Sequence, residues 1–352
     1  MIRAINFFAI ANDGSTRRHD HIDAGELPQK LSDSLTSWTE FIVDDVTTGA
    51  DEVVKQFGIT LSPTDLLSGY YSSYEDRGEV LGLMMPVLTL SSGETKASPV
   101  LIYLKEGQVI TIHDERTERL IVLSNYAEVF MRKLPSGKEN WADRQTLIAA
   151  RIIDEIVEHN FEILRLIVER AEQLQIELGE MQQLPRDTAR EMSNIKRWIL
   201  DFLNAVWGAR TTVHMLRYGD AEMITDKTEL LSRFELILAE LDRKIQMTEQ
   251  VSEVLTAGMN VIQTEIQNKL ATIIVWLTVV ATAFLVPNTL ATIYGLLPVD
   301  GASRPWMILS LIFATVASTF LAYWYAWRWW HPMKIRVKRR NMDKIEKEKL
   351  SS

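Results

Sequence analysis

Hydroxyl and amide side chains share one stripe inside a long uncharged segment of the chain. The stripe consists of Thr278, Thr282, Leu285, Thr289 and Thr292, with Asn288 on its border. Its members follow at intervals of four, three, four and three residues, which places them on one face of an α-helix. Hydroxyl and amide oxygens can bind a cation or its water shell, whereas lipid chains gain nothing from them. The stripe therefore predicts a helix face that meets water inside a membrane.

Apolar residues interrupt the stripe and predict constrictions. If several such helices surround a common axis, Ile274, Leu277, Ala281 and Leu285 form apolar rings that gate by excluding water. The threonines have a second interpretation, since their hydroxyls can bond to carbonyls of their own helix or pack at a small-residue interface. We favour the pore. Its predicted lining is Ile274, Thr278, Ala281, Thr282, Leu285, Asn288, Thr289 and Thr292.

Two uncharged segments must position this face. No charged residue lies between Lys269 and Asp300 or between Arg304 and Arg328. Each segment is longer than the roughly 20 residues that an α-helix needs to cross a bilayer. A buried hairpin in a soluble protein is the alternative. The expected elements are transmembrane helices at 270–295 and 305–328 and an extracytoplasmic loop at 296–304.

Two helices cannot enclose a water-filled path. A pore therefore requires a homo-oligomer in the lipid bilayer, in which each subunit contributes its first transmembrane helix. Pro287 lies within that helix, lacks an N–H group and leaves the carbonyl of Ala283 without its helical donor. Such an oxygen is tolerated where it meets water or a neighbouring helix. We expect a kink at this point.

The distribution of charge predicts the orientation. The last 22 residues carry eight Lys or Arg and three Asp or Glu, whereas the loop between the spans has only Asp300 and Arg304. By the positive-inside rule, the basic tail at 329–352 and the N-terminal part are both cytoplasmic, and the protein lies in the cell (inner) membrane. Tryptophans mark both boundaries of the second span: Trp306, Trp324, Trp327, Trp329 and Trp330.

The composition restricts the class of function. The chain has 352 residues, a formal net charge of −9 and no cysteine. An acidic protein attracts cations and repels nucleic acid, so we expect no nucleic-acid partner. Without cysteine there are no disulfides and no thiolate metal sites. The opening "MIRAINFFAIANDG" has too short an apolar run for a signal peptide.

Residues 1–140 alternate strand and helix signals, which predicts a cytoplasmic α/β domain. The predicted strands lie at 38–46, 80–90, 99–115 and 119–124, with a hairpin turn at "KEG" inside the third. The predicted helices lie at 49–58 and 62–70, where Ser62 precedes Pro63 as N-cap. The segment has no glycine-rich phosphate loop, and we expect no organic cofactor.

Helical periodicity begins at Trp141 and persists. Antiparallel helices are expected at 141–221, with a break at Pro185, followed by a stalk helix at 222–269 that starts near Met223. The stalk has no strong helix breaker before Pro287, so it continues into the first membrane span. Such a helix couples the cytoplasmic domain to that span mechanically.

Several segments resemble the two-transmembrane CorA family of magnesium channels, including its zinc-transporting ZntB branch. They are "NKLATIIVWLTVVATAFLVPNTLATIYG", "EIVEHNFEILRLIVERAEQLQIEL", "VITIHDE" and "FGITLSPTDLLSG". The similarity extends over essentially the whole chain. It implies an α+β membrane protein that assembles as a homopentamer. Each subunit then has a cytoplasmic α/β funnel, a stalk helix continuous with the pore-lining span, and a peripheral second span.

The chain departs from this family at the expected pore entrance. Tyr294 and Gly295 match the family signature, but Leu296 and Leu297 replace the Met-Asn pair whose asparagine amides hold the hydrated ion. Leucine forms no hydrogen bond, so selection would move to Asn288, Thr292 or the threonine rings. The predicted entrance is Tyr294, Gly295, Leu296, Leu297 and Asp300.

The resemblance also implies regulation by divalent ions that carboxylates bind between cytoplasmic domains. An ion that binds the closed state more tightly shifts the population towards it. The candidate ligands on the stalk are Asp242, Glu249 and Glu253, although acids on such a helix are commonly just solvated. Mg²⁺ is the first expectation for the transported and regulatory ion, and Zn²⁺, Co²⁺ and Ni²⁺ are related possibilities.

Three hypotheses remain open: a CorA-like cation channel, a ZntB-like transporter driven by another gradient, and a pentameric membrane scaffold or ion sensor with little transport. An enzyme is not expected, because the histidines form no HExxH or nucleophile arrangement. These histidines are His19, His21, His113, His159, His214 and His331.

Overall fold

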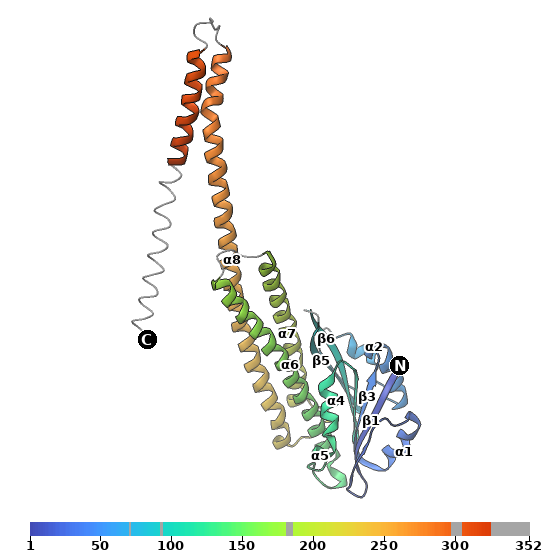
Figure 1. Cartoon of the computed structure of the whole chain (residues 1–352). Coiled ribbons are helices and arrows are strands. Elements are labelled where there is room, and N and C mark those ends of the chain that lie inside the picture. The colour runs from blue at the N-terminus through green and yellow to red at the C-terminus, as the bar shows by residue number, and fades with distance from the viewer. Residues whose placement is uncertain (70–71, 92–93, 181–185, 297–304, 325–352) are drawn as a thin grey trace, which may run out of the picture. The chain divides into compact units, whose positions relative to one another are not determined.

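The computed structural model describes residues 1–69, 72–91, 94–180, 186–296 and 305–324 (Figure 1). The chain divides into two compact units, Met1–Met259 and Asn260–Ser352. The first unit holds a β-sheet and long helices, and the second holds two apolar helices. The α+β class predicted from the sequence is therefore confirmed.

A single seven-stranded sheet organises the first unit. Its order is β2-β1-β3-β7-β6-β5-β4, and all neighbours are antiparallel except β3 and β7. The strands are β1 Ile2–Ala11, β2 Thr16–His19, β3 Ser34–Val43, β4 Ser73–Asp76, β5 Val80–Ser91, β6 Glu94–Lys105 and β7 Gln108–Asp114. β6 and β7 are joined by a hairpin at the predicted "KEG" turn, where Lys105 pairs with Gln108 and Gly107 adopts φ 70°.

Helices cover both faces of the sheet. Apolar side chains of one face, such as Phe41 and Ile112, share a core with Val53 and Leu66 of the short helices. The other face packs against α6 and α7 (Figure 1). The helices are α1 Leu27–Ser32, α2 Val46–Gln56, α3 Pro63–Leu67, α4 Glu118–Asn125, α5 Ala127–Met131, α6 Trp141–Glu180 and α7 Arg186–Tyr218, with 3-10 turns at Ala24–Glu26 and Lys138–Asn140.

Hydrogen bonds from α6 complete the part of β5 that β4 does not pair. The β4 ladder ends at Met84, and beyond it the amide of Asn160 donates to Pro86 O at 2.9 Å and accepts from Leu88 N at 2.8 Å. His159 Nε2 lies 3.0 Å from Leu88 O. Because buried backbone groups must be paired, these contacts fix α6 on the sheet.

The sequence prediction was wrong in one strand. Residues 119–124 were predicted as a strand, but they form α4. β7 ends at Asp114, whose carboxylate accepts a hydrogen bond from Arg116 N at 3.0 Å, and Thr117 N bonds to Asp114 O. The chain therefore turns before "RLIVLS", and a short apolar run does not by itself distinguish strand from buried helix. The N-terminal strand β1 was not predicted at all.

The last and longest helix, α8, spans Thr228–Leu296. It begins later than the predicted start near Met223, because α6 holds the preceding loop in non-helical contacts. Gln145 Nε2 donates to Met223 O at 2.8 Å, and Thr225 Oγ1 donates to Asp143 Oδ1 at 2.6 Å. Lys227 also bonds to Asp143. The helix then continues through Pro287, as the sequence suggested.

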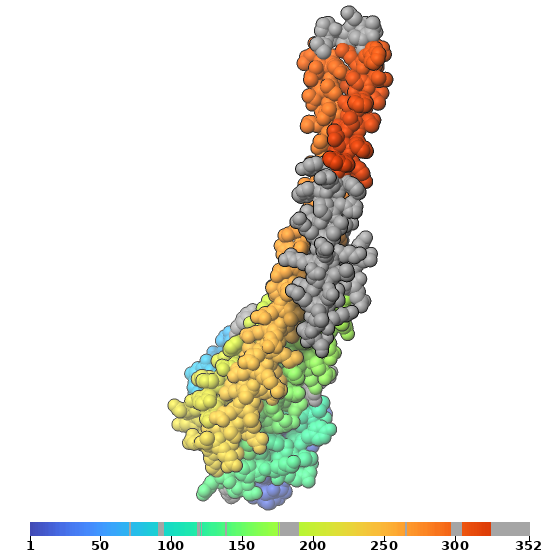
Figure 2. Space-filling model, turned by 90° about the vertical axis from the view of Figure 1, so that its left-hand side faces the viewer, coloured from blue at the N-terminus to red at the C-terminus, as the bar shows by residue number. Residues whose placement is uncertain are grey.

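The second unit pairs the end of α8 with a helix at Pro305–Trp324. Figure 2 shows the two segments, orange and red, side by side. In their most apolar windows, 11% of α8 and none of the second helix is buried, unlike the core helices of a soluble protein. Large apolar side chains face outward, as at Phe284 and Phe313. Both helices are long and apolar enough to cross a membrane, so the soluble-hairpin alternative fits poorly.

The carbonyl that Pro287 frees receives a donor from the second helix. Ser318 Oγ lies 3.0 Å from Ala283 O and 3.1 Å from the carbonyl of Thr315 on its own helix, so its hydrogen is shared between them. Ala283 and Ser318 are each only 8% exposed. A neighbouring helix thus satisfies the oxygen, which is one of the two outcomes expected from the sequence.

We expect Ser318→Ala to weaken the second unit by about 1 kcal/mol, because the Ala283 carbonyl loses its donor in an apolar environment. In a Pro287→Ala background the cost should shrink, since the new N–H at 287 restores the helical bond. The free energy of unfolding in detergent micelles measures both effects. Thr319→Ala is the matched control, because that hydroxyl bonds only within its own helix, to Thr315 O at 2.7 Å. Equal losses in both backgrounds would contradict this assignment.

We expect low pH to destabilise the contacts that hold the loop before α8. Burial alone would raise the pKa of Asp143, but hydrogen bonds from Lys227 and Thr225 hold that pKa below its usual value. A lowered folded-state pKa means that the stabilisation is present at neutral pH and is lost as the pH falls below about 4. We expect Asp143→Asn to cost about 1–3 kcal/mol at pH 7 and much less in acid.

Urea unfolding of the full chain at several pH values measures this difference. Asp154→Asn is the control, because that carboxylate lies on the same helix and is 42% exposed beside Arg151. A cost of Asp143→Asn that is independent of pH would show that the carboxylate does not carry the interaction.

Candidate ion pathway and ion-binding residues

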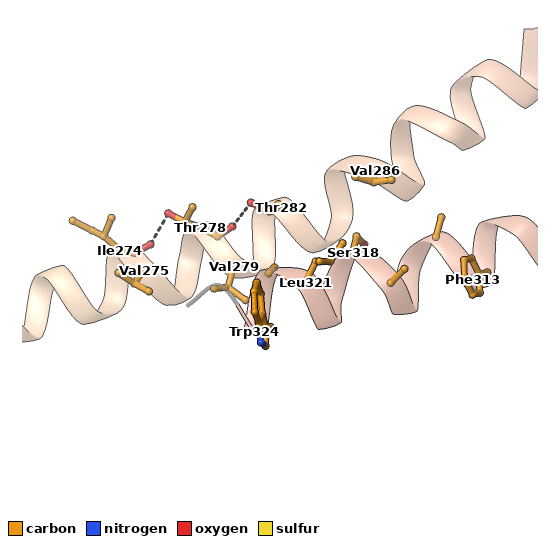
Figure 3. A pocket seen from close by; sticks show the side chains of 13 residues that line it. Ile274, Val275, Thr278, Val279, Thr282, Val286, Phe313, Ser318, Leu321 and Trp324 are labelled. Carbon is orange, nitrogen blue, oxygen red and sulfur yellow. Dashed lines mark hydrogen bonds between the residues drawn. The ribbon is translucent and has the colours of Figure 1, made fainter. Parts of the chain in front are cut away.

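Most of the predicted pore lining lies on the side of α8 away from the second helix, although Ile274, Thr278 and Thr282 also border the groove between the two helices. The half-buried or buried residues Val275, Val279 and Ala283 form the opposite face, which packs against that helix. In Figure 3, Val275 and Val279 point towards the second helix, whereas Ile274 and Thr278 point away from it. Every predicted lining residue is exposed: Ile274, Thr278, Ala281, Thr282, Leu285, Asn288, Thr289 and Thr292.

The hydroxyl groups of the stripe all donate within α8. Thr278, Thr282, Thr289 and Thr292 each place Oγ1 at 2.8 Å from the carbonyl four residues earlier. This is the intrahelical bonding that the sequence left open. These intrahelical bonds still allow the hydroxyl oxygens to interact with a cation, because a hydroxyl that donates its hydrogen keeps its oxygen lone pairs. The stripe therefore presents hydrogen-bond acceptors, which suit a cation or the hydrogens of its water shell and not an anion.

A groove with a volume of about 790 Å³ runs between the two helices and is not an ion site (Figure 3). Ile274, Thr278 and Thr282 of the predicted pore lining are among its lining residues, together with Phe313, Leu321 and Trp324. Its hydroxyls bond to backbone carbonyls, and none of its described lining residues is charged. Nothing in this groove can compensate an ion for lost water.

The predicted entrance residues separate into two groups. Tyr294 faces the second helix, where its OH lies 2.9 Å from Ser310 Oγ; since Ser310 donates to Met307 O at 2.8 Å, Tyr294 is the donor. A side chain on Gly295 would meet no atom within 4 Å, and Leu296 is 83% exposed at the end of α8. Leu297 and Asp300 lie outside the described residues. The tyrosine thus holds the helix end in place.

The candidate regulatory acids share one side of α8, at spacings of seven and four residues. Arg210 Nε on α7 donates to Asp242 Oδ1 at 2.5 Å, and this hydrogen bond raises the pKa of Arg210. Glu249 and Glu253 are exposed. Within the described part of this single chain, no three His, Asp or Glu side chains are grouped to hold a metal ion. Any ligand set made from these acids would need a second subunit.

The histidines form no catalytic group among the described residues. His113 is fully buried, with Nε2 3.1 Å from Glu40 Oε1, and Asn6 donates to the other oxygen of Glu40 at 2.8 Å. This buried network joins β1, β3 and β7 and therefore belongs to the sheet. His159 bonds to β5, and His19 lines a polar cavity. His331 lies outside the described residues.

Sequence reasoning missed two residues of the second helix, Ser318 and Ser310. Both bond to α8, to the Ala283 carbonyl and to Tyr294. A signal was present for the first, because a proline inside a membrane helix creates a carbonyl that needs a donor from elsewhere. Which of the hydroxyls in the second helix supplies it depends on how the helices are paired, and that is not a local property.

Comparison with solved structures shows the same fold in proteins of low sequence identity. The complete CorA magnesium transporter of Methanocaldococcus jannaschii superposes with a TM-score of 0.68 at 18% identity, covering 92% of this chain and 98% of that one. The full-length CmaX protein gives a TM-score of 0.61 at 15% identity, with 92% and 97% covered. The ZntB cytoplasmic domain from Vibrio parahaemolyticus gives 0.53 at 8% identity, with 75% and 100% covered.

Comparison by sequence adds the family. No curated protein matches the chain. A family model described as CorA-like Mg²⁺ transporter protein matches residues 36–328, which include most of the sheet, α6, α7, α8 and the second apolar helix. Together with the two membrane-length helices, this match shows that the chain belongs to the CorA-like Mg²⁺ transporter family.

Proposed function

We propose that the chain is the subunit of a homo-oligomeric channel for divalent cations, with Mg²⁺ as the first candidate and Zn²⁺, Co²⁺ or Ni²⁺ as related ones. One α8 from each subunit lines the pore, and the second helix lies outside it. The observation that carries this proposal is the exposed stripe of hydroxyl and amide groups on α8, most of which lies away from the face that packs on the second helix. Five subunits follow from the resemblance to the family.

The acceptor character of the stripe supports a cation as substrate. Each threonine oxygen of the stripe donates its hydrogen to its own helix and turns lone pairs outward. The water molecules around Mg²⁺ offer hydrogens, and this ion loses its inner waters reluctantly. Rings of such oxygens and of the Asn288 amide can hold the hydrated ion without removing its water.

Apolar rings between the oxygen rings supply the closed state. Ile274, Ala281 and Leu285 lie on the same exposed face, and the Leu285 side chain is 65% exposed. A narrow ring of leucine side chains expels water from that part of the pore. Ions cannot pass the dry segment, although the side chains do not close it completely. The continuous helix from Thr228 to Leu296 joins this gate to the first unit.

Regulation would take place on the cytoplasmic side of the inner membrane, where the first unit and both termini would lie. Glu249 and Glu253 are exposed on α8 and free to meet the carboxylates of a neighbouring subunit. Asp242 is a poorer ligand because Arg210 already compensates its charge. Divalent ions held between subunits would favour the closed state, since their carboxylates repel one another without the ion.

The alternative function is a pentameric scaffold or ion sensor with little transport. Leu296 favours it, because this residue ends α8 with an exposed side chain that forms no hydrogen bond. Flux of Mg²⁺, Zn²⁺, Ni²⁺ and K⁺ into liposomes separates the two functions. An intact oligomer that passes none of these ions would exclude the channel and leave the scaffold or sensor.

We expect Asn288→Leu and Thr282→Leu each to reduce divalent flux roughly 5- to 30-fold, because each replaces an acceptor ring by an apolar one and removes about 1–2 kcal/mol of ion stabilisation per ring. Liposome flux with matched protein amounts measures the loss. Thr272→Leu is the control: this threonine makes the same 2.8 Å bond to the carbonyl four residues earlier, but it lies on the half-buried face. Equal effects of all three variants would count against the assigned pore face.

Leu297→Asn should raise selectivity for Mg²⁺ over K⁺, because it restores an amide at the position where the family signature has one. Reversal potentials in planar bilayers under mixed-ion gradients measure the ratio. Leu297→Ala is the control, since it removes bulk without adding a hydrogen-bonding group. If the asparagine and alanine variants gave the same ratio, ion selection would lie deeper in the pore.

A further inference from the structure

A polar cavity of about 640 Å³ lies at the edge of the sheet in the first unit. Its floor is the β1–β2 hairpin, which places Phe7 opposite His19 and Ala9 opposite Arg17. Its wall is the segment from Glu26 to Ser34, which includes α1. This volume is in the range of pockets that bind small molecules.

Three basic side chains converge on this cavity from two elements. Arg17 and His19 come from β2, and Lys30 comes from α1. Burial lowers the pKa of His19, and the positive charges of Lys30 and Arg17 lower it further, which places both charges near the imidazole. Like charges brought together around a hollow repel one another unless an anion joins them.

Two acidic side chains, Glu26 and Asp33, also line the cavity, and Asp13 lies beside Arg17. Glu26 lies 3.5 Å from Lys30, and Asp13 lies 3.5 Å from Arg17, while both carboxylates are 61% exposed. Asp13 also accepts shorter bonds from Ser15, at 2.6 and 2.8 Å. Ion pairs this long and this exposed contribute little, so both cations can bind a ligand.

Apolar residues form the floor, and two buried hydroxyls lie beside it. Phe7 and Ala9 are each 2% exposed, so the floor is apolar and closely packed. Their partners on β3 are Thr39 and Ser37, whose hydroxyls are buried without a hydrogen-bond partner within the described residues. Directly paired residues share one face of a sheet, so these hydroxyls lie beside the floor.

We propose that this cavity binds a small molecule that carries a phosphate group, with Arg17, His19 and Lys30 around the phosphate. The guanidinium and ammonium groups form charge-assisted hydrogen bonds with phosphate oxygens. The uncharged remainder lies on Phe7 and Ala9, and Glu26, Gln29 or Asp33 accept bonds from its hydroxyl or amino groups. A bound metal ion fits less well, because the positive charges of Arg17 and Lys30 would repel it.

Isothermal titration calorimetry on the full chain in detergent micelles tests this proposal with inorganic phosphate and adenosine 5′-monophosphate as probes and adenosine as the phosphate-free comparison. We expect saturable binding of at least one phosphate probe and none of adenosine. Binding of the monophosphate alone would show that the floor contributes, and binding of both probes would show that phosphate suffices. Adenosine binding as tightly as its monophosphate would overturn the proposal, as would no binding of either probe at millimolar concentration.

Variants assign the binding to this cavity. Arg17→Ala and Lys30→Ala should each weaken binding about tenfold or more, since each removes a charged hydrogen bond. Arg165→Ala is the matched control, because that arginine is 68% exposed on α6. If Lys30→Ala lowers the thermal stability, Lys30→Met keeps the aliphatic stem and removes only the charge. Unchanged affinity in the folded Arg17 and Lys30 variants would place the binding elsewhere and refute the proposal.

Discussion

The arrangement of the second unit depends on one constraint: inside a bilayer, every backbone polar group must find its partner within the protein. Pro287 violates this locally, because it leaves the Ala283 carbonyl without a helical donor. Ser318 supplies the donor from the neighbouring helix at 3.0 Å, and Tyr294 adds a second bond to that helix through Ser310. These two bonds orient α8 about its axis and thereby turn the opposite face outward.

The orientation of α8 decides which chemical role the threonine stripe can have. Hydroxyls bonded to their own helix could indicate a merely structural role, and the same bonds leave oxygen lone pairs on the exposed side. The large groove between the helices does not compete as an ion site, because it is apolar and its hydroxyls are already bonded. In the proposed channel, this acceptor face would meet the common axis of the subunits.

Much of the architecture followed from local signals. The uncharged segments, the hairpin at Gly107, the long helix from Trp141 and the continuity of α8 were all predicted. Two predictions were wrong for different reasons: "RLIVLS" was predicted as a strand, and α8 was predicted to begin near Met223. Local hydrogen bonds to Asp114 turn the chain before "RLIVLS", whereas bonds of the distant Asp143 to Thr225 and Lys227 hold the loop before α8.

The sequence by itself determined the family, the membrane-length segments and the oxygen-bearing stripe, because these depend on residue types and on periodicity along one helix. Only the tertiary structure decided which face of α8 meets the second helix. It also decided that Ser318 donates a hydrogen bond to the Ala283 carbonyl and that Arg210 donates one to the Asp242 carboxylate. It also brought Arg17 and Lys30, from different elements, to one cavity. Such pairings depend on how helices and strands pack together, and spacing within a single element does not encode them.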